Sequence, residues 1–142
     1  MLQGSFICRS KSDTEDLARK LASEITPPCV VAFYGDLGAG KTFFIQSMCR
    51  FWGVDEHVVS PTFSLLGEYR GRDFDVFHFD AYRLDSQAFF DAGFGDYLFS
   101  DGVCLIEWAE NISLEVKHFE VHIGGSGDDE RSISISCHDE LT

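Results

Sequence analysis

Residues 35–42 constrain the fold of this chain more than any other segment. They read Gly-Asp-Leu-Gly-Ala-Gly-Lys-Thr and match the pattern G-x-x-x-x-G-K-[ST] at every fixed position. In such a loop, backbone N–H groups surround an anionic phosphate chain, and glycines allow the close approach because they lack a Cβ. The pattern therefore predicts a strand–loop–helix unit that binds a nucleoside triphosphate.

The segments on either side of the loop fit this prediction. Residues 29–34 read CVVAFY, an apolar and β-branched run that is typical of a buried strand. After the loop, one face of a predicted helix carries Ile45, Met48, Cys49 and Trp52, and Gly53 is a suitable residue to end that helix. The alternative is an ordinary glycine-rich turn, which the flanking strand and helix disfavour.

Within the loop, two side chains have expected roles in binding the phosphates. Lys41 reaches the outer phosphates, and the hydroxyl of Thr42 is placed to contact a magnesium ion. The predicted helix directs the positive end of its dipole at the same place. Charge, dipole and metal ion are therefore expected to meet at one end of this helix.

Glu107 is the candidate for a second magnesium contact. It follows the apolar strand predicted at residues 103–106, and ligands of open α/β sheets collect at the carboxyl ends of the strands. There Glu107 could hold the ion together with Thr42, directly or through water. The alternative is a solvated carboxylate at the end of a strand.

Two further candidates concern the attacking water and the terminal phosphate. Asp80 ends the strand predicted at residues 74–79, which makes it a candidate to orient or activate water, although a strand-end or turn aspartate is the alternative. The segment Ser60-Pro61-Thr62-Phe63 lies where a switch segment often senses the terminal phosphate, with Thr62 as the residue to test. A turn before a strand would also explain this segment.

The charge of the chain argues against direct, tight binding of nucleic acid. The 142 residues include 24 acidic and 11 basic side chains, so the net charge is −13, and the basic residues form no run. Neutralising phosphates requires clustered cations. A basic partner protein is easier to reconcile with this composition.

Cysteine usage and hydropathy indicate a cytoplasmic location. The five cysteines are scattered and include no C-x-x-C pair, which is typical of reduced thiols. No segment approaches the roughly 18 apolar residues that a membrane span needs. His118 and His122 are expected at the surface, whereas Phe89 and Phe90 are expected mainly in the core.

The pattern of strands and helices predicts a single domain over residues 1–142. Its expected fold is a three-layer α/β sandwich of the phosphate-loop NTPase type with a mixed central sheet. Ser12 is expected to cap the first helix, with Glu15 completing a capping box. The other expected elements are strands at 6–8, 64–69, 74–79, 103–106, 119–123 and 132–136, and a helix at 86–92.

Four motifs in this order resemble the TsaE family over essentially the whole chain. The motifs are the phosphate loop, Ser-Pro-Thr-Phe at 60–63, His-x-Asp-x-Tyr-Arg-Leu at 78–84, and Ile-Glu-Trp at 106–108. Members of this family are small bacterial ATPases required to make N6-threonylcarbamoyladenosine in tRNA. Two departures are Ala109, where the family usually has proline, and the sequence Gln-Ala-Phe-Phe-Asp at 87–91, where it is typically rich in glutamate.

The resemblance implies a set of site residues. It implies Mg²⁺ at Thr42 and Glu107, a catalytic role for Asp80 and a switch role for Thr62. It also implies that the arginine at position 131 approaches the nucleotide. The implied ATP contacts are Asp36, Leu37, Gly38, Ala39, Gly40, Lys41, Thr42 and Phe43.

The resemblance also implies partners. Family members act with a TsaB–TsaD-like heterodimer, so tRNA would be met only through that complex, and no membrane is involved. Two other functions stay open on the residues. A small-molecule kinase would use Asp80 and Arg83 near its acceptor, but no arginine-rich lid is visible. A guanine-nucleotide switch would need an Asn-Lys-x-Asp motif, which is absent.

Overall fold

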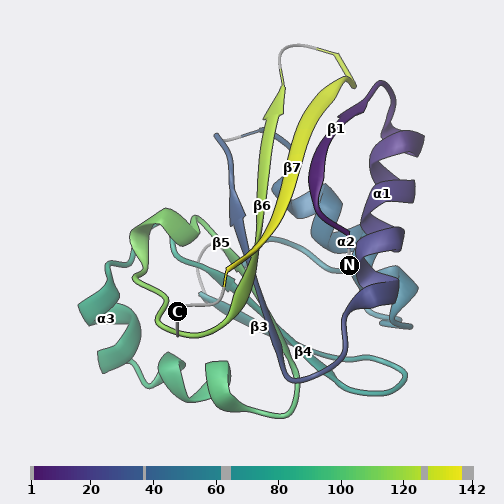
Figure 1. Ribbon diagram of the computed structural model, residues 1–142. Helices are drawn as coiled ribbons and strands as arrows, with labels where there is room; N and C mark the ends of the chain where they lie inside the picture. Colours follow the sequence, from purple (N-terminus) through teal and green to yellow (C-terminus); the bar gives the residue numbers. More distant parts are fainter. Residues whose placement is uncertain (1, 37, 62–64, 126–127, 139–142) are drawn as a thin grey trace.

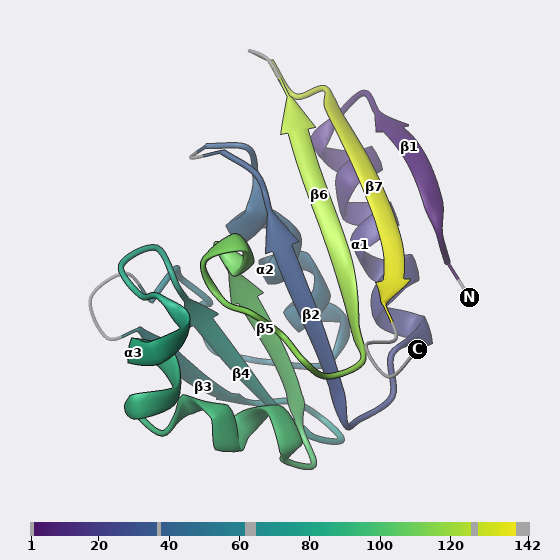
Figure 2. The same ribbon diagram turned by 60° about the vertical axis from the view of Figure 1, so that its left-hand side comes forward.

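The computed structural model describes residues 2–36, 38–61, 65–125 and 128–138, and within these ranges the strands form one mixed sheet (Figure 1). Figure 2 shows the strands side by side in the order β1-β7-β6-β2-β5-β4-β3. This architecture confirms the predicted α/β fold with a mixed sheet. The strands are β1 (Gly4–Cys8), β2 (Cys29–Tyr34), β3 (Leu66–Arg70), β4 (Asp75–Asp80), β5 (Val103–Glu107), β6 (His118–Gly125) and β7 (Arg131–His138).

The centre of the sheet is parallel. Strand β2 pairs in parallel with β5 and β6, and β5 pairs in parallel with β4, whereas β3, β7 and β1 are antiparallel to their neighbours. Because helices cover both faces of the central strands, β2 reads CVVAFY and β5 is apolar up to Glu107. All five residues of β5 are buried, including its last residue, Glu107. The carboxyl ends of β2, β5 and β4 consequently meet at one edge of the sheet.

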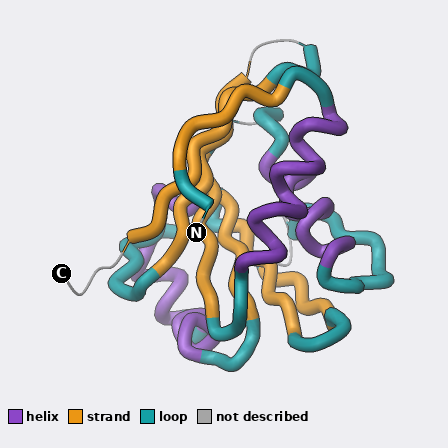
Figure 3. Tube along the Cα trace, turned by 45° about the vertical axis from the view of Figure 1, so that its right-hand side comes forward, coloured by secondary structure: helices purple, strands orange, loops and turns teal. Residues whose placement is uncertain are grey.

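Two long helices cover one face of the sheet (Figures 1 and 3). Helix α1 (Lys11–Glu24) packs beside α2 (Lys41–Phe51), and the indole N–H of Trp52 donates to the carbonyl of Ala22 at 3.1 Å. Gly53, with φ +82°, follows the end of α2, as predicted. Trp52 therefore joins the ends of the two helices.

The predicted cap of α1 is wrong by two residues. Ser10 is the N-cap, because its backbone is extended and its side chain accepts a hydrogen bond from Asp13 N at 3.1 Å. Asp13 in turn accepts from Arg9 N at 3.0 Å, which satisfies a second N–H group at the helix start. Ser12 lies inside the helix and cannot act as its cap.

Shorter helices cover the parallel strands on the other face. These are α3 (Ser86–Asp91) and the 3-10 helices η1 (Phe94–Phe99) and η2 (Ala109–Asn111). Phe89 is fully buried against Phe79 of β4, with ring centroids 5.4 Å apart. Phe90, which was expected in the core together with Phe89, is 44% exposed.

The described residues contain no helix with the length and apolar character that a membrane crossing requires. All five cysteines are free thiols, as the sequence predicted. Burial raises the pKa of Cys49 and of Cys104 to about 12. These thiols are therefore protonated and unreactive at neutral pH.

A cluster of polar rings on β6 and β7 corrects the expectation that His118 lies at the surface. His118 is only 4% exposed, and both of its ring nitrogens have partners. Nδ1 lies 2.8 Å from the carbonyl of Val116, and Nε2 lies 3.0 Å from Oε2 of Glu120. His122 is exposed, as predicted, and its Nε2 lies 3.1 Å from Oε1 of Glu120. Nε2 of His138 lies 3.3 Å from the same oxygen.

Glu120 is thus surrounded by three imidazole rings, while the hydroxyl of Tyr34 lies 3.5 Å from its Oε2. Burial raises the pKa of the Glu120 carboxyl, but hydrogen bonds from His122 and His118 and the charge of His138 outweigh that effect. The net result is a pKa below the ordinary value of 4.5. A lowered folded-state pKa contributes stability above the unfolded-state pKa, and this contribution is lost as the pH falls through the folded-state value.

We predict that Glu120→Gln lowers the free energy of unfolding by up to about 1 kcal/mol at about pH 6, since the pairs are partly exposed. The difference from wild type should shrink at a second, acidic pH, once the pH has fallen through the lowered folded-state pKa of the carboxyl. Urea unfolding at both pH values measures this change. Glu56→Gln, at an exposed site, is the control and should show no such pH dependence. A Glu120→Gln difference that persists unchanged in acid would contradict the assignment.

Candidate functional site

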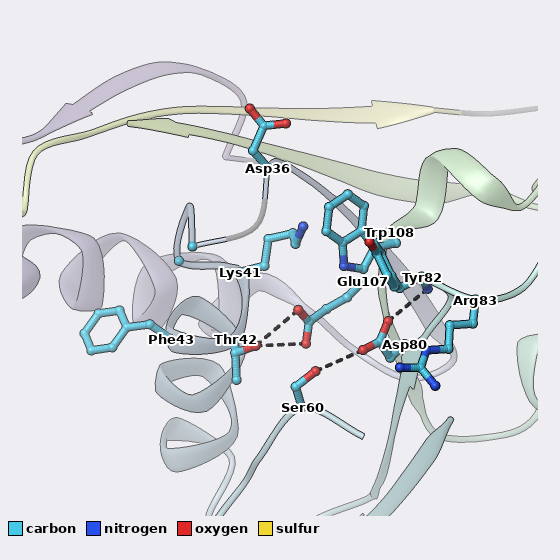
Figure 4. A pocket seen from close by; sticks show the side chains of 12 residues that line it. Asp36, Lys41, Thr42, Phe43, Ser60, Asp80, Tyr82, Arg83, Glu107 and Trp108 are labelled. Atoms are coloured by element: carbon cyan, nitrogen blue, oxygen red, sulfur yellow. Dashed lines mark hydrogen bonds between the residues drawn. The ribbon is translucent and has the colours of Figure 1, made fainter. Parts of the chain in front are cut away.

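The carboxyl ends of the parallel strands border a cavity of about 400 Å³ (Figure 4). This cavity contains the predicted side chains of Lys41, Thr42, Asp80 and Glu107, although they come from separate parts of the chain. The predicted residues Leu37 and Thr62 lie outside the described residues. The cavity is lined by Asp36, Gly38, Gly40, Lys41, Thr42, Phe43, Ser60, Asp80, Tyr82, Arg83, Glu107 and Trp108.

The phosphate loop turns from β2 into α2 through glycines that no other residue replaces easily. Gly38 and Gly40 have φ of +81° and +107°, in the left-handed region that favours glycine. A Cβ on Gly35 would lie only 2.6 Å from the carbonyl oxygen of Ile123. Gly40 is the N-cap of α2 and no side chain caps it, so the start of this helix can accept an anion.

Lys41 is held inside the cavity. It is 5% exposed, its ammonium donates to the carbonyl of Gly35, and Nζ lies 3.5 Å from the centre of a Trp108 ring. Burial lowers the pKa of Lys41, and nearby carboxylates oppose this effect, Glu107 most strongly. The ammonium therefore rests on groups that an incoming phosphate can replace.

Trp108 has a left-handed backbone, with φ of 59°, which is rare outside glycine. This turn directly follows Glu107, and Figure 4 shows the indole beside Lys41. The sequence left open whether Trp108 fills the core or lies over the nucleotide site. Its contact with Lys41 places it at the cavity.

Thr42 and Glu107 form the candidate magnesium site. Oγ1 of Thr42 lies 3.1 Å from each carboxylate oxygen of Glu107, which is only 3% exposed. Hydroxyl and carboxylate oxygens are the hard ligands that Mg²⁺ prefers. The residues present therefore fit this ion.

Asp80 is fixed by two hydrogen-bond donors at the end of β4. Oδ2 accepts from the hydroxyl of Ser60 at 3.1 Å, and Oδ1 accepts from the backbone N–H of Tyr82 at 2.9 Å. Its neighbour across the strands is Glu107, in register. Sequence reasoning placed Ser60 in a switch segment but did not pair it with Asp80.

Sequence reasoning also missed the contact of His78 with Glu107. Nε2 of His78 lies 2.6 Å from Oε2 of Glu107, and the side chain is fully buried. A signal was available, because residues two apart on a strand share a face and His78 lies two residues before Asp80.

Arg131 lies against the outer side of the phosphate loop. Its Nε donates to the carbonyl of Ala39 at 2.8 Å, so the predicted residue Ala39 is engaged from β7. A second cavity of about 170 Å³ lies here and is lined in part by Gly40, Phe43 and Arg131. The predicted residues Gly40 and Phe43 border both cavities.

We predict that Gly35→Ala destabilises the protein by at least about 2 kcal/mol, because the added Cβ meets the backbone of β6. Gly38→Ala is the matched control. It has a strained φ, but among the described residues other than its chain neighbours no atom lies within 4 Å of its added Cβ, so we expect a loss of only about 1 kcal/mol. Thermal and urea unfolding of both variants measure the difference. Equal losses would mean that the contact with Ile123 does not limit this position.

Comparisons with known proteins identify the family of this chain. The family described as "Threonylcarbamoyl adenosine biosynthesis protein TsaE" matches residues 8–133. The tRNA threonylcarbamoyladenosine biosynthesis protein TsaE of Bacillus subtilis is 36% identical over 127 residues, which cover 88% of this chain and 80% of that protein. The Rickettsia bellii protein of the same name is 35% identical over 140 residues, which cover 96% of each chain.

A solved structure shows the same fold. The crystal structure of Bacillus subtilis YdiB superposes with a TM-score of 0.78 at 29% sequence identity, covering 96% of this chain and 86% of that one. The match over residues 8–133 contains every motif on which the resemblance was based. The chain therefore belongs to the TsaE family.

Proposed function

We propose that this protein is a Mg²⁺-dependent ATPase that acts in the formation of N6-threonylcarbamoyladenosine in tRNA. The observation that carries the ATPase part is one cavity that holds Lys41, the Thr42–Glu107 pair and an oriented Asp80. Phosphoryl transfer depends mainly on positioning and on charge stabilisation. The names of the relatives support the pathway.

In this proposal the phosphate loop holds the triphosphate. Lys41 leaves the carbonyl of Gly35 and the indole of Trp108 to neutralise the outer phosphates. Thr42 and Glu107 would hold Mg²⁺, which would supply charge stabilisation when the triphosphate is bound. The remaining ATP contacts come from Asp36, Leu37, Gly38, Ala39, Gly40 and Phe43, with Arg131 bracing Ala39 from β7.

Asp80 orients the attacking water. Ser60 and the N–H of Tyr82 each engage one carboxylate oxygen, so rotation of the carboxylate is restricted. A water molecule that donates a hydrogen bond to the Asp80 carboxylate would therefore be held in a defined position. Thr62 is proposed as the residue that senses the terminal phosphate.

The partner in this proposal is a TsaB–TsaD-like heterodimer in the cytoplasm. A net charge of −13 without a basic run favours binding to a protein over direct binding to tRNA. One sheet that includes both β1 and β7 supports a single ATPase domain over the 142 residues. The tRNA would meet this protein only through the heterodimer.

The test is ATP hydrolysis by the purified protein, alone and with TsaB- and TsaD-like proteins of the same organism. We expect the partners to stimulate turnover and Lys41→Ala to abolish ATP binding. Asp80→Asn and Glu107→Gln should each reduce turnover by about 100-fold or more, while the fold survives. Lys20→Ala, on the exposed face of α1, is the matched lysine control and should hydrolyse ATP normally.

The same assay separates the other two functions. Transfer of phosphate to a nucleoside or metabolite, in place of water, would indicate a small-molecule kinase. Among the described residues that line the main cavity, Arg83 is the only arginine, which does not favour that reading. Tighter binding of GTP than of ATP would indicate a guanine-nucleotide switch.

We also predict that ATP changes the fluorescence of Trp108. Phosphates should draw the Lys41 ammonium away from the indole, which alters the surroundings of the ring. Titration with ATP and Mg²⁺, with emission recorded at each step, measures this change. Trp108→Phe leaves the buried Trp52 as the remaining emitter and should abolish the response. A response that survives in Trp108→Phe would contradict the proposed path of Lys41.

A further inference from the structure

We propose that His78 is a positioning residue, which donates a hydrogen bond to Glu107 and fixes the orientation of this carboxylate for Mg²⁺. The inference rests on the proposed function, because the ion belongs to that proposal. Nε2 of His78 lies 2.6 Å from Oε2 of Glu107, and both side chains are almost completely excluded from solvent.

The burial of His78 requires a compensating interaction. Its neighbours on the same face of the sheet include Val76 and Leu105, which are fully buried and apolar. Transferring an imidazole into such surroundings costs free energy unless it forms hydrogen bonds. Among the described residues Nδ1 of His78 has no partner, so the contact with Glu107 is the polar interaction that compensates this ring.

The direction of the hydrogen bond follows from the chemistry of the acceptor. An ionised carboxylate only accepts hydrogen bonds, so Nε2 must carry the proton and donate it. This arrangement resembles the outer-shell contacts that orient metal ligands in other proteins.

The consequence for Glu107 is that its two oxygens become unequal. Oε2 accepts from His78 and from the hydroxyl of Thr42, whereas Oε1 has only the Thr42 hydroxyl as a hydrogen-bond partner among the described residues. His78 thus holds one oxygen on the core side, and Glu107 still lines the cavity. The carboxylate therefore cannot rotate freely when Mg²⁺ approaches.

Two substitutions separate this role from simple packing. The amide nitrogen of His78→Gln can reach the place of Nε2, whereas that of His78→Asn reaches only the place of the unpartnered Nδ1. We expect His78→Asn to raise the Mg²⁺ concentration for half-maximal ATP hydrolysis by about tenfold or more, and His78→Gln to stay within about threefold of wild type. ATP binding in EDTA, which does not need the ion, should be unchanged in both.

A second measurement does not depend on hydrolysis. Nitrogen-15 NMR of the imidazole in the nucleotide-free wild-type protein should show a proton on Nε2 of His78, the nitrogen that faces Glu107. An unprotonated Nε2 would overturn the proposal, and so would wild-type Mg²⁺ dependence in His78→Asn. Loss of Mg²⁺-free ATP binding in both variants would assign His78 to the fold alone.

The two proposals fail in different ways. A wild-type protein that neither binds nor hydrolyses ATP would contradict the proposed function. The tautomer of His78 is measured without nucleotide, so it would still decide whether this ring donates to Glu107. Normal hydrolysis by the wild type, with equal Mg²⁺ dependence in all three proteins, would leave the ATPase in place and remove the role of His78.

Discussion

The parallel pairing of β2 with β5 is the constraint on which the site depends. Its register sets Phe33 opposite Glu107, and the phosphate loop begins two residues after Phe33. The start of the loop therefore lies beside the carboxylate that contacts Thr42. Strand β4 adds Asp80 in register with Glu107 on the other side. Because successive side chains on a strand point to opposite faces, a slip of one residue would turn Glu107 away from the loop. The chemistry of the cavity is therefore set by backbone pairing.

The same edge concentrates buried charge, and each charged group has a partner. Lys41, Asp80 and Glu107 are all 5% exposed or less. Unpaired charges at this depth would cost several kcal/mol each, but a carbonyl, a hydroxyl, a backbone N–H and an imidazole engage them. The Lys41 ammonium also lies over the ring of Trp108, which lines the cavity. A bound polyanion could thus replace the present partners of the Lys41 ammonium, and the ammonium would not be left without a partner in an apolar environment.

Sequence patterns predicted the helices and strands that depend on local burial and periodicity, but they did not predict the long-range contacts. The apolar run before Gly35 and the helical spacing from Ile45 to Trp52 both placed elements correctly, because burial and periodicity leave a local signature. The cap of α1 was misplaced because Ser10 and Ser12 both suit that position, and only the extended backbone at Ser10 distinguishes them. Spacing predicted Asp80 and Glu107 at strand ends.

The partners of those residues could not be read in the same way. His118 was wrongly expected at the surface. The strand pairing that brings His138 beside it joins residues 20 positions apart across a hairpin, and local spacing gives no sign of such a contact. Similarly, the contact of His78 with Glu107 spans 29 residues and depends on the register of β4 with β5. Such contacts follow from the order and register of the strands in the sheet, which local sequence patterns do not reveal.

The contact between Arg131 and Ala39 links the phosphate loop to a strand 92 residues later in the chain. Strand β1 likewise pairs with β7 and with no other described strand. During synthesis on the ribosome, the loop and its helix emerge well before β6 covers the open edge of β2. Non-local pairing of this kind forms late, since it must first close a long loop. A nascent chain would therefore carry the complete phosphate-loop motif for some time before the strands that hold this loop in place have paired.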